Sequence, residues 1–203
     1  MSHISPKVVV LSKGETVRVR CAGDADVAVL LEHRVHMADN NPHGVTEPDE
    51  VSHDPVKMNE MIKDHAEKHG WLFLVVEQVA AGQSPDAADP PGLILGELTF
   101  RNGSRRKVAH QGDFGISVHA DWRGRGIGRV MIETLMEWAA AHDTIEKIFL
   151  GALSTNKRAI RLYRRLGFRK EAVRHSFFKL GPGQYVDDVM MSRWVKPKNP
   201  GEC

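Results

Sequence analysis

The sequence has few cysteines and no long apolar segment. Its 203 residues include two cysteines, Cys21 and Cys203, which lack the paired spacing of a disulfide scaffold. No uninterrupted apolar run reaches the roughly 20 residues that cross a bilayer, and the N-terminus lacks the apolar core of a signal peptide. We therefore expect a cytoplasmic protein with reduced thiols and no membrane partner.

The sequence also has no large excess of positive or negative charge. The chain has 28 lysines and arginines against 26 aspartates and glutamates, a net charge of +2. This balance gives no argument for nucleic acid as a partner. His33, His36 and His43 are close in sequence, but no Cys/His spacing is typical of a metal site. We expect surface or core histidines and no metal.

The length and composition suit a single compact domain. The hydrophobic content of 41% and the charged content of 27% are ordinary for globular proteins, and 22.7 kDa is enough to bury a substantial core. We expect one domain over 1–203, with about 8–195 as its structured part and 196–203 as a loose tail. The stretch 80–92 is rich in small and turn-forming residues, which predicts a flexible hairpin insertion.

Apolar patterning predicts strands and helices along most of the chain. Strands and helices alternate towards the C-terminus. This order indicates a mixed sheet with helices on its faces. We expect strands over 8–11, 16–20, 71–77, 93–100, 114–119, 147–153 and 185–191, and helices over 25–37, 54–70, 130–142 and 159–166.

A glycine-rich turn between a predicted strand and a predicted helix carries the strongest functional signal. The run is Arg123-Gly124-Arg125-Gly126-Ile127-Gly128. Glycine lets the backbone come close to a ligand, and the first N–H groups of a helix attract phosphate because they have no partner within the helix. Arg123, Arg125 and Arg129 add positive charge. The turn therefore predicts a pyrophosphate-bearing ligand.

The spacing of the glycines narrows the kind of ligand. Counted from Gly124, the sixth position is Arg129, so the dinucleotide fingerprint fails, and no Gly-Lys-Ser/Thr ends a P-loop. A nucleotide-binding module is therefore disfavoured. The pattern Arg-x-x-Gly-x-Gly fits, with Arg123, Gly126 and Gly128 as its fixed points. It resembles the acetyl-CoA-binding signature of the GNAT superfamily of N-acetyltransferases.

Two downstream segments support the same resemblance. Residues 156–168 are similar to the family segment Asn-x-x-Ala-x-x-x-Tyr-x-x-x-Gly-Phe at every fixed position, and 185–191 resembles the last strand of many members. The matched segments run from 114 to 191 in the family's order. The fixed positions are Asn156, Ala159, Tyr163, Gly167 and Phe168.

The resemblance implies an α/β (α+β) GNAT fold. Its mixed, mostly antiparallel central sheet would have about six to seven strands flanked by about four helices. A splayed strand pair would admit the pantetheine arm of acetyl-CoA, which is the co-substrate. The resemblance also allows a homodimer as the oligomeric state. The residues implied to bind acetyl-CoA are Ile116, Ser117, Val118, Arg123, Gly124, Arg125, Gly126, Ile127, Gly128, Arg129 and Asn156.

Acetyl transfer also needs groups that move protons. The thiolate that leaves acetyl-CoA needs a proton donor, and we assign this role to Tyr163, because a tyrosine with a pKa near ~10 stays protonated at neutral pH. A structural tyrosine is the alternative. For the general base, Asp113 begins a strand near the turn, and Glu97 lies among apolar residues of the preceding strand. Either carboxylate, or a water molecule, could take the amine's proton.

The resemblance thus predicts an acyltransferase, an N-acetyltransferase. It would move the acetyl group to a primary amine by direct attack in a ternary complex. The acceptor could be a small amine, an amino acid or the N-terminus of a peptide or protein. The alternative is a CoA-binding regulatory domain, or pseudoenzyme, without turnover.

Overall fold

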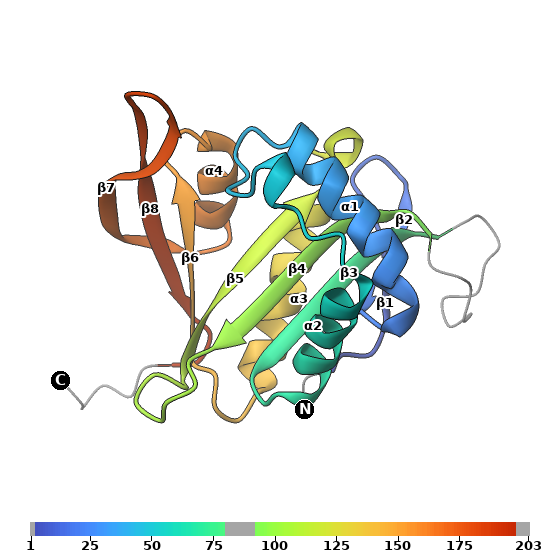
Figure 1. Ribbon diagram of the computed structural model, residues 1–203. Coiled ribbons are helices and arrows are strands. Elements are labelled where there is room, and N and C mark those ends of the chain that lie inside the picture. The colour runs from blue at the N-terminus through green and yellow to red at the C-terminus, as the bar shows by residue number, and fades with distance from the viewer. Residues whose placement is uncertain (1–2, 80–91, 198–203) are drawn as a thin grey trace. The chain divides into compact units, whose positions relative to one another are not determined.

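The computed structural model describes residues 3–79 and 92–197 (Figure 1). Most of the predicted insertion over 80–92 and of the tail over 196–203 lies outside these described residues. The chain forms two compact units. Unit 1 comprises residues 1–100 and 115–135, and unit 2 comprises 101–114 and 136–203. A single domain over 1–203 stays a prediction.

The strands of unit 1 follow the order β1-β2-β3-β4-β5. β1 and β2 are antiparallel, with Lys7 opposite Val19. β2 and β3 are also antiparallel, with Val17 opposite Gln78. β5 begins in unit 2 and ends in unit 1, so both units share it. The strands are β1 (Lys7–Val10), β2 (Thr16–Cys21), β3 (Trp71–Gln78), β4 (Ile94–Asn102) and β5 (Gln111–Val118).

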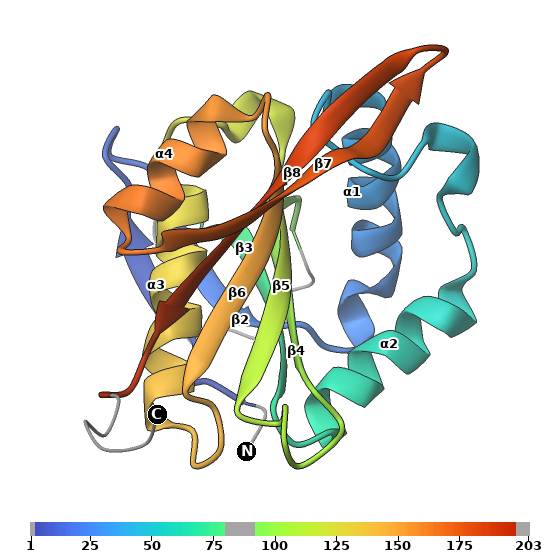
Figure 2. The ribbon, with the colours of Figure 1, turned by 90° about the vertical axis from the view of Figure 1, so that its left-hand side faces the viewer.

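Helices cover both faces of the strands of unit 1 (Figures 1 and 2). α1 (Val27–Asn40) and α2 (Pro55–Glu67) lie on one face, and the first part of α3 (Ile127–Ala141) lies on the other. α2 begins as its sequence predicts. Asp54 accepts hydrogen bonds from the backbone N–H groups of Val56 and Lys57, and Pro55 occupies the first turn, where no N–H is needed.

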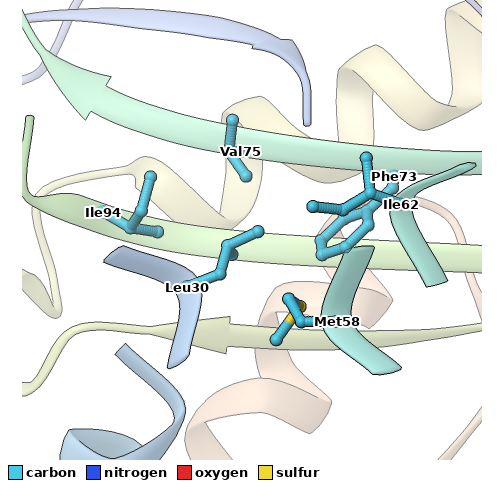
Figure 3. Packing of buried hydrophobic residues seen from close by; sticks show 6 residues of the cluster. All are labelled: Leu30, Met58, Ile62, Phe73, Val75 and Ile94. Atoms are coloured by element: carbon cyan, nitrogen blue, oxygen red, sulfur yellow. The ribbon is translucent and has the colours of Figure 1, made fainter. Parts of the chain in front are cut away.

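An apolar cluster holds α1 and α2 against the strands (Figure 3). Its side chains converge from both helices and from β3 and β4. Fully burying one such side chain stabilises the folded state by about 1.5–3 kcal/mol. Leu30 belongs to the cluster, so its packing fixes the position of the next helical turn of α1 relative to the sheet. That turn carries His33 and Arg34. The cluster comprises Leu30, Met58, Ile62, Phe73, Val75 and Ile94, each at most 3% exposed.

Unit 2 is built on the strand order β5-β6-β8-β7. β5 and β6 (Lys147–Leu153) are parallel, and their ladder joins the first three residues of each, Gln111–Asp113 and Lys147–Phe149. β6 pairs antiparallel with β8 (Gln184–Trp194), and β8 pairs antiparallel with β7 (Arg169–Gly181), with which it forms a long hairpin (Figure 2). The helices of this unit are the end of α3 and α4 (Lys157–Arg165).

The predicted fold class is confirmed, and the predicted number of strands is too low. Residues 3–79 and 92–197 form a mixed, mostly antiparallel sheet of eight strands with four α-helices, rather than six to seven strands. β7 is the strand that the sequence did not predict. Most of its side chains are exposed and its register with β8 shifts three times, so it lacks the regular alternation typical of a strand. In the part of the chain described, no helix has the length and apolarity to cross a membrane.

Candidate functional site

The glycine-rich turn in unit 1 has the backbone conformation of an anion-binding loop. Gly124 and Gly126 have φ angles of +86° and +106°, which side chains other than glycine rarely adopt. α3 begins immediately afterwards, at Ile127. The first N–H groups of this 15-residue helix have no partner within the helix, and its dipole favours negative charge there. The turn therefore suits a phosphate group.

The arginines around the turn are engaged with the protein. The Nε of Arg123 donates to the carbonyl of Val118 at 3.2 Å. Arg125 forms an ion pair with Glu15 at 2.5 Å and lies 4.6 Å from the ring of Trp122. Arg129 pairs with Glu133 at 2.8 Å. The main-chain N–H groups, rather than unpaired guanidinium groups, are therefore the principal donors that the turn offers.

The turn is held close to the strands by a glycine in β4. A Cβ atom at Gly96 would lie 2.8 Å from the side chain of Met131 and 3.1 Å from the carbonyl of Ser117. A side chain at this position would require Met131 and the backbone at Ser117 to shift, so glycine suits the close packing of α3 and β5 on β4. The N–H of His119 then donates to the carbonyl of Leu95 at 2.9 Å, which ties the start of the turn to β4.

Beside these elements unit 1 contains a cavity of about 470 Å³, a volume within the usual range for small-molecule sites. Its wall comes from α1, the segment that joins α1 to α2, α2 itself, and single residues of β4 and β5. Both apolar and charged side chains line it. The lining residues include Leu31, Arg34, Met37, Val45, Glu50, Val51, Asp54, Lys57, Met58, Met61, Glu97 and Ser117.

Glu97 is the predicted base candidate that lies in this cavity. Its side chain is 14% exposed, and its carboxylate accepts hydrogen bonds from the Nε of Arg34 at 3.2 and 3.3 Å. Burial raises the pKa of Glu97, although the neighbouring guanidinium lowers it. A carboxylate with a raised pKa in a cavity is a candidate proton acceptor.

The sequence did not single out Arg34. Its position could have been suspected because it lies one helical turn after the apolar Leu30 and Leu31, on the side of α1 that faces the sheet. His33, its neighbour, was expected to be a surface or core histidine, and it is buried at 2% exposure. Its Nε2 lies 2.8 Å from the hydroxyl of Ser117, which lines the cavity.

Tyr163 lies on α4 in unit 2, in a buried aromatic cluster. Its ring makes edge-to-face contacts with Phe114 and Phe168, each at a centroid distance of 6.0 Å. Burial raises the pKa of Tyr163 to about 12, so its hydroxyl is protonated throughout the neutral range. The residue can donate a proton, but it is a weaker acid than an exposed tyrosine.

Asn156 and Asp113, two further predicted site residues, lie in unit 2. Asn156 is the N-cap of α4, and its side-chain oxygen accepts a hydrogen bond from the N–H of Ala159 at 3.1 Å. Asp113 is exposed on β5, whereas its neighbour Phe114 is buried on the opposite face. The cap explains an asparagine at 156, and the pantetheine contact of Asn156 stays a prediction.

The sequence has clear similarity to known proteins. Residues 46–168 match the model of the acetyltransferase (GNAT) family. The chain is 28% identical over 138 residues to the L-amino acid N-acetyltransferase AaaT of Escherichia coli (strain K12), an alignment that covers 68% of this chain and 83% of the relative.

Solved structures show the same fold. An acetyltransferase of the GNAT family from Streptococcus pneumoniae superposes with a TM-score of 0.78 at 19% identity, over 89% of this chain and 99% of the other. The structure of yncA from Salmonella typhimurium, which was determined with its cofactor acetyl-CoA, has a TM-score of 0.74 at 21% identity, over 92% and 98% of the two chains.

Proposed function

Because the chain belongs to the acetyltransferase (GNAT) family, we propose that it transfers the acetyl group of acetyl-CoA to the α-amino group of a free amino acid. The observation that carries this proposal is the pairing of Arg34 with Glu97 in the wall of one cavity. The name of the Escherichia coli relative, an L-amino acid N-acetyltransferase, supports the same class of acceptor.

The two charged groups match the two ends of an amino acid. The Nη1 and Nη2 atoms of Arg34 lie 3.7 and 3.6 Å from the sulfur of Met61, which is a weak hydrogen-bond acceptor. A carboxylate would be a far better partner for them, since it can accept from a guanidinium in a bidentate manner. Glu97 can in turn attract the ammonium group.

The rest of the cavity indicates which side chains are accepted. Leu31, Met37, Met58 and Met61 form an apolar wall. Methionine is unbranched and adapts its shape to different apolar ligands. We therefore expect apolar amino acids such as methionine and leucine to be better acceptors than charged ones.

The turn in unit 1 fits the pyrophosphate of acetyl-CoA. Gly124 and Gly126 bring the backbone into an open conformation, and the nearest atom to a Cβ placed on Gly126 is 4.0 Å away, so the position is not closed by other protein groups. The N–H groups at the start of α3 would bind the phosphate oxygens. The backbone of Ile116, Ser117 and Val118 would pair with the pantetheine arm.

Two residues would move protons in this reaction, Glu97 as the base and Tyr163 as the acid. The carboxylate of Glu97 would take a proton from the bound ammonium, a transfer that its raised pKa favours. The free amine would then attack the thioester carbonyl, so that a C–N bond forms and the C–S bond breaks. Tyr163 would give its hydroxyl proton to the departing sulfur and recover, by way of solvent, the proton that the nitrogen loses on forming the amide. Glu97 would release its proton to solvent.

Acetyl-CoA-dependent release of CoA thiol tests this proposal. We would compare L-methionine, its amide, its decarboxylated amine and a peptide with N-terminal methionine. The proposal expects the free acid to be the best acceptor, because it alone has an α-carboxylate for Arg34. Equal rates with the acid and the amide, or a preference for the peptide, would contradict an amino acid acceptor. Tight CoA binding without turnover would support a regulatory domain instead.

A further inference from the structure

We propose that His33 is a positioning residue, which fixes the hydroxyl of Ser117 as a hydrogen-bond acceptor for the amine of the acceptor substrate. The inference rests on the proposed function, since it concerns the same cavity. His33 itself does not line the cavity. It acts through Ser117, which does.

The hydrogen bonds of His33 determine which ring nitrogen carries the proton. Nδ1 lies 3.1 Å from the carbonyl oxygen of Ile94, and Nε2 lies 2.8 Å from the hydroxyl oxygen of Ser117. A carbonyl oxygen can only accept, so Nδ1 must be the protonated nitrogen. In the neutral ring Nε2 is then an acceptor, and the Ser117 hydroxyl donates to it.

The surroundings of His33 keep the ring neutral. The side chain is 2% exposed, and burial is the main reason why its pKa falls to about 4. The rings of His119 and His36, together with the guanidinium of Arg34, also disfavour a positive charge at this position. At neutral pH the imidazole is therefore a stable acceptor for Ser117 and does not exchange roles with it.

The contact with His33 determines which hydrogen bonds the Ser117 hydroxyl can still form. A serine hydroxyl has one hydrogen to donate and two lone pairs that can accept. Because its hydrogen is directed to His33, Ser117 can offer only lone pairs to a ligand in the cavity. Glu97, in the wall of the same cavity, is an acceptor too. An acceptor amine has N–H groups for both, which leaves its own lone pair to face the thioester.

The test is a double-mutant cycle on His33 and Ser117. His33→Asn can keep the hydrogen bond to Ile94, because the asparagine amide reaches about as far as Nδ1, but it removes the acceptor for Ser117. Ser117→Ala removes the hydroxyl. As a control, His142→Asn alters another buried histidine, whose Nδ1 accepts a hydrogen bond from the N–H of Thr144; neither residue lines the cavity.

We would measure the dissociation constant of L-methionine by calorimetry and its KM and kcat by CoA release. His33→Asn should weaken methionine binding roughly five- to tenfold, the usual effect of one hydrogen bond. It should add nothing in the Ser117→Ala background, and the KM for acetyl-CoA should not change. His142→Asn should lower the melting temperature and leave the affinity for methionine as it is.

The outcomes separate this inference from the proposed function. If the two substitutions weaken methionine binding additively, or if His33→Asn changes only stability, the positioning role is wrong even where turnover is normal. If methionine binds with the expected coupling but no acetylation occurs, only the proposed reaction is wrong. If methionine does not bind to the wild-type protein, both are wrong.

Discussion

The Nε of Arg34 lies 3.2 Å from the carboxylate of Glu97, although 63 residues separate the two along the chain. The guanidinium lowers the pKa of Glu97, and burial raises it more strongly. The result is a carboxylate that has a fixed partner and still binds a proton more readily than an exposed glutamate. This balance determines the first prediction.

Activity should depend on the protonation of Glu97. The carboxyl group accepts a proton only when it is ionised, so kcat/KM should fall as the pH drops through its raised pKa. That fall should begin at a higher pH than the value of about 4.3 for an exposed glutamate. Glu97→Gln should lower kcat about a hundredfold or more and abolish this acidic limb, whereas Glu60→Gln, at an exposed position on α2, should do neither. A pH profile of CoA release checks both statements.

Arg34 should determine the preference for a free carboxylate. Arg34→Gln should raise the KM for L-methionine about tenfold or more and leave the KM for the corresponding amide nearly unchanged, because the amide makes no ion pair. Arg34→Lys keeps the charge but loses the planar fork, so its effect should be intermediate. An equal rise in KM for acid and amide would contradict carboxylate recognition.

The glycine turn should control affinity for acetyl-CoA. Gly126→Ala forces a side chain into a φ angle of +106°, which costs about 1–3 kcal/mol and distorts the N–H groups at the start of α3. The dissociation constant of acetyl-CoA, measured by calorimetry, should rise at least about fivefold, and that of L-methionine should not.

The matched control is Gly183→Ala, at the turn between β7 and β8, with a φ angle of +72° and open space around it. Its free energy of unfolding should fall by about as much as that of Gly126→Ala, and its affinity for acetyl-CoA should not change. If both glycine variants bind acetyl-CoA as the wild type does, the turn is not the pyrophosphate site.

Tyr163→Phe should separate chemistry from binding. The variant loses the proposed proton donor but keeps the ring that packs on Phe114 and Phe168, so kcat should fall about a hundredfold while the affinity for acetyl-CoA is retained. Tyr185→Phe removes the hydroxyl of the only other tyrosine, which is 55% exposed, and should not change kcat. Unchanged turnover in Tyr163→Phe would assign the residue a structural role.

His33 should make stability depend on pH. Its pKa is about 4 in the folded protein and near 6.5 in the unfolded chain, so the unfolded state binds more protons in this window. The free energy of unfolding should therefore decrease as the pH falls from 6.5 towards 4, by roughly 2–3 kcal/mol from this group. Denaturant titrations at several pH values should show a flatter decrease for His33→Asn.

Local signals in the sequence predicted much of this fold. The Asp54-Pro55 start of α2 and the glycine turn before α3 depend on neighbouring residues, so the sequence shows them directly. β6 was predicted with its observed bounds, Lys147–Leu153, because its residues form one short apolar run. β7 was not predicted, because a mostly exposed strand with shifts in register gives no regular hydrophobic period.

The candidate site was only partly predictable, and the reason is distance along the chain. Glu97 was proposed as a base from its apolar neighbours, but its partner Arg34 comes from a different element. His33 and Ser117 are 84 residues apart, and nothing near either residue indicates the contact. Such pairs arise only when α1 packs on the sheet through side chains such as Leu30, which a single sequence does not reveal.

The ion pairs around the glycine turn have a consequence for the choice of cofactor. Glu15 and Glu133 form ion pairs with Arg125 and Arg129, so a phosphate bound at the turn would be held by the direction of the N–H groups more than by net charge. The choice among phosphate-bearing ligands would then depend on their shape more than on their charge.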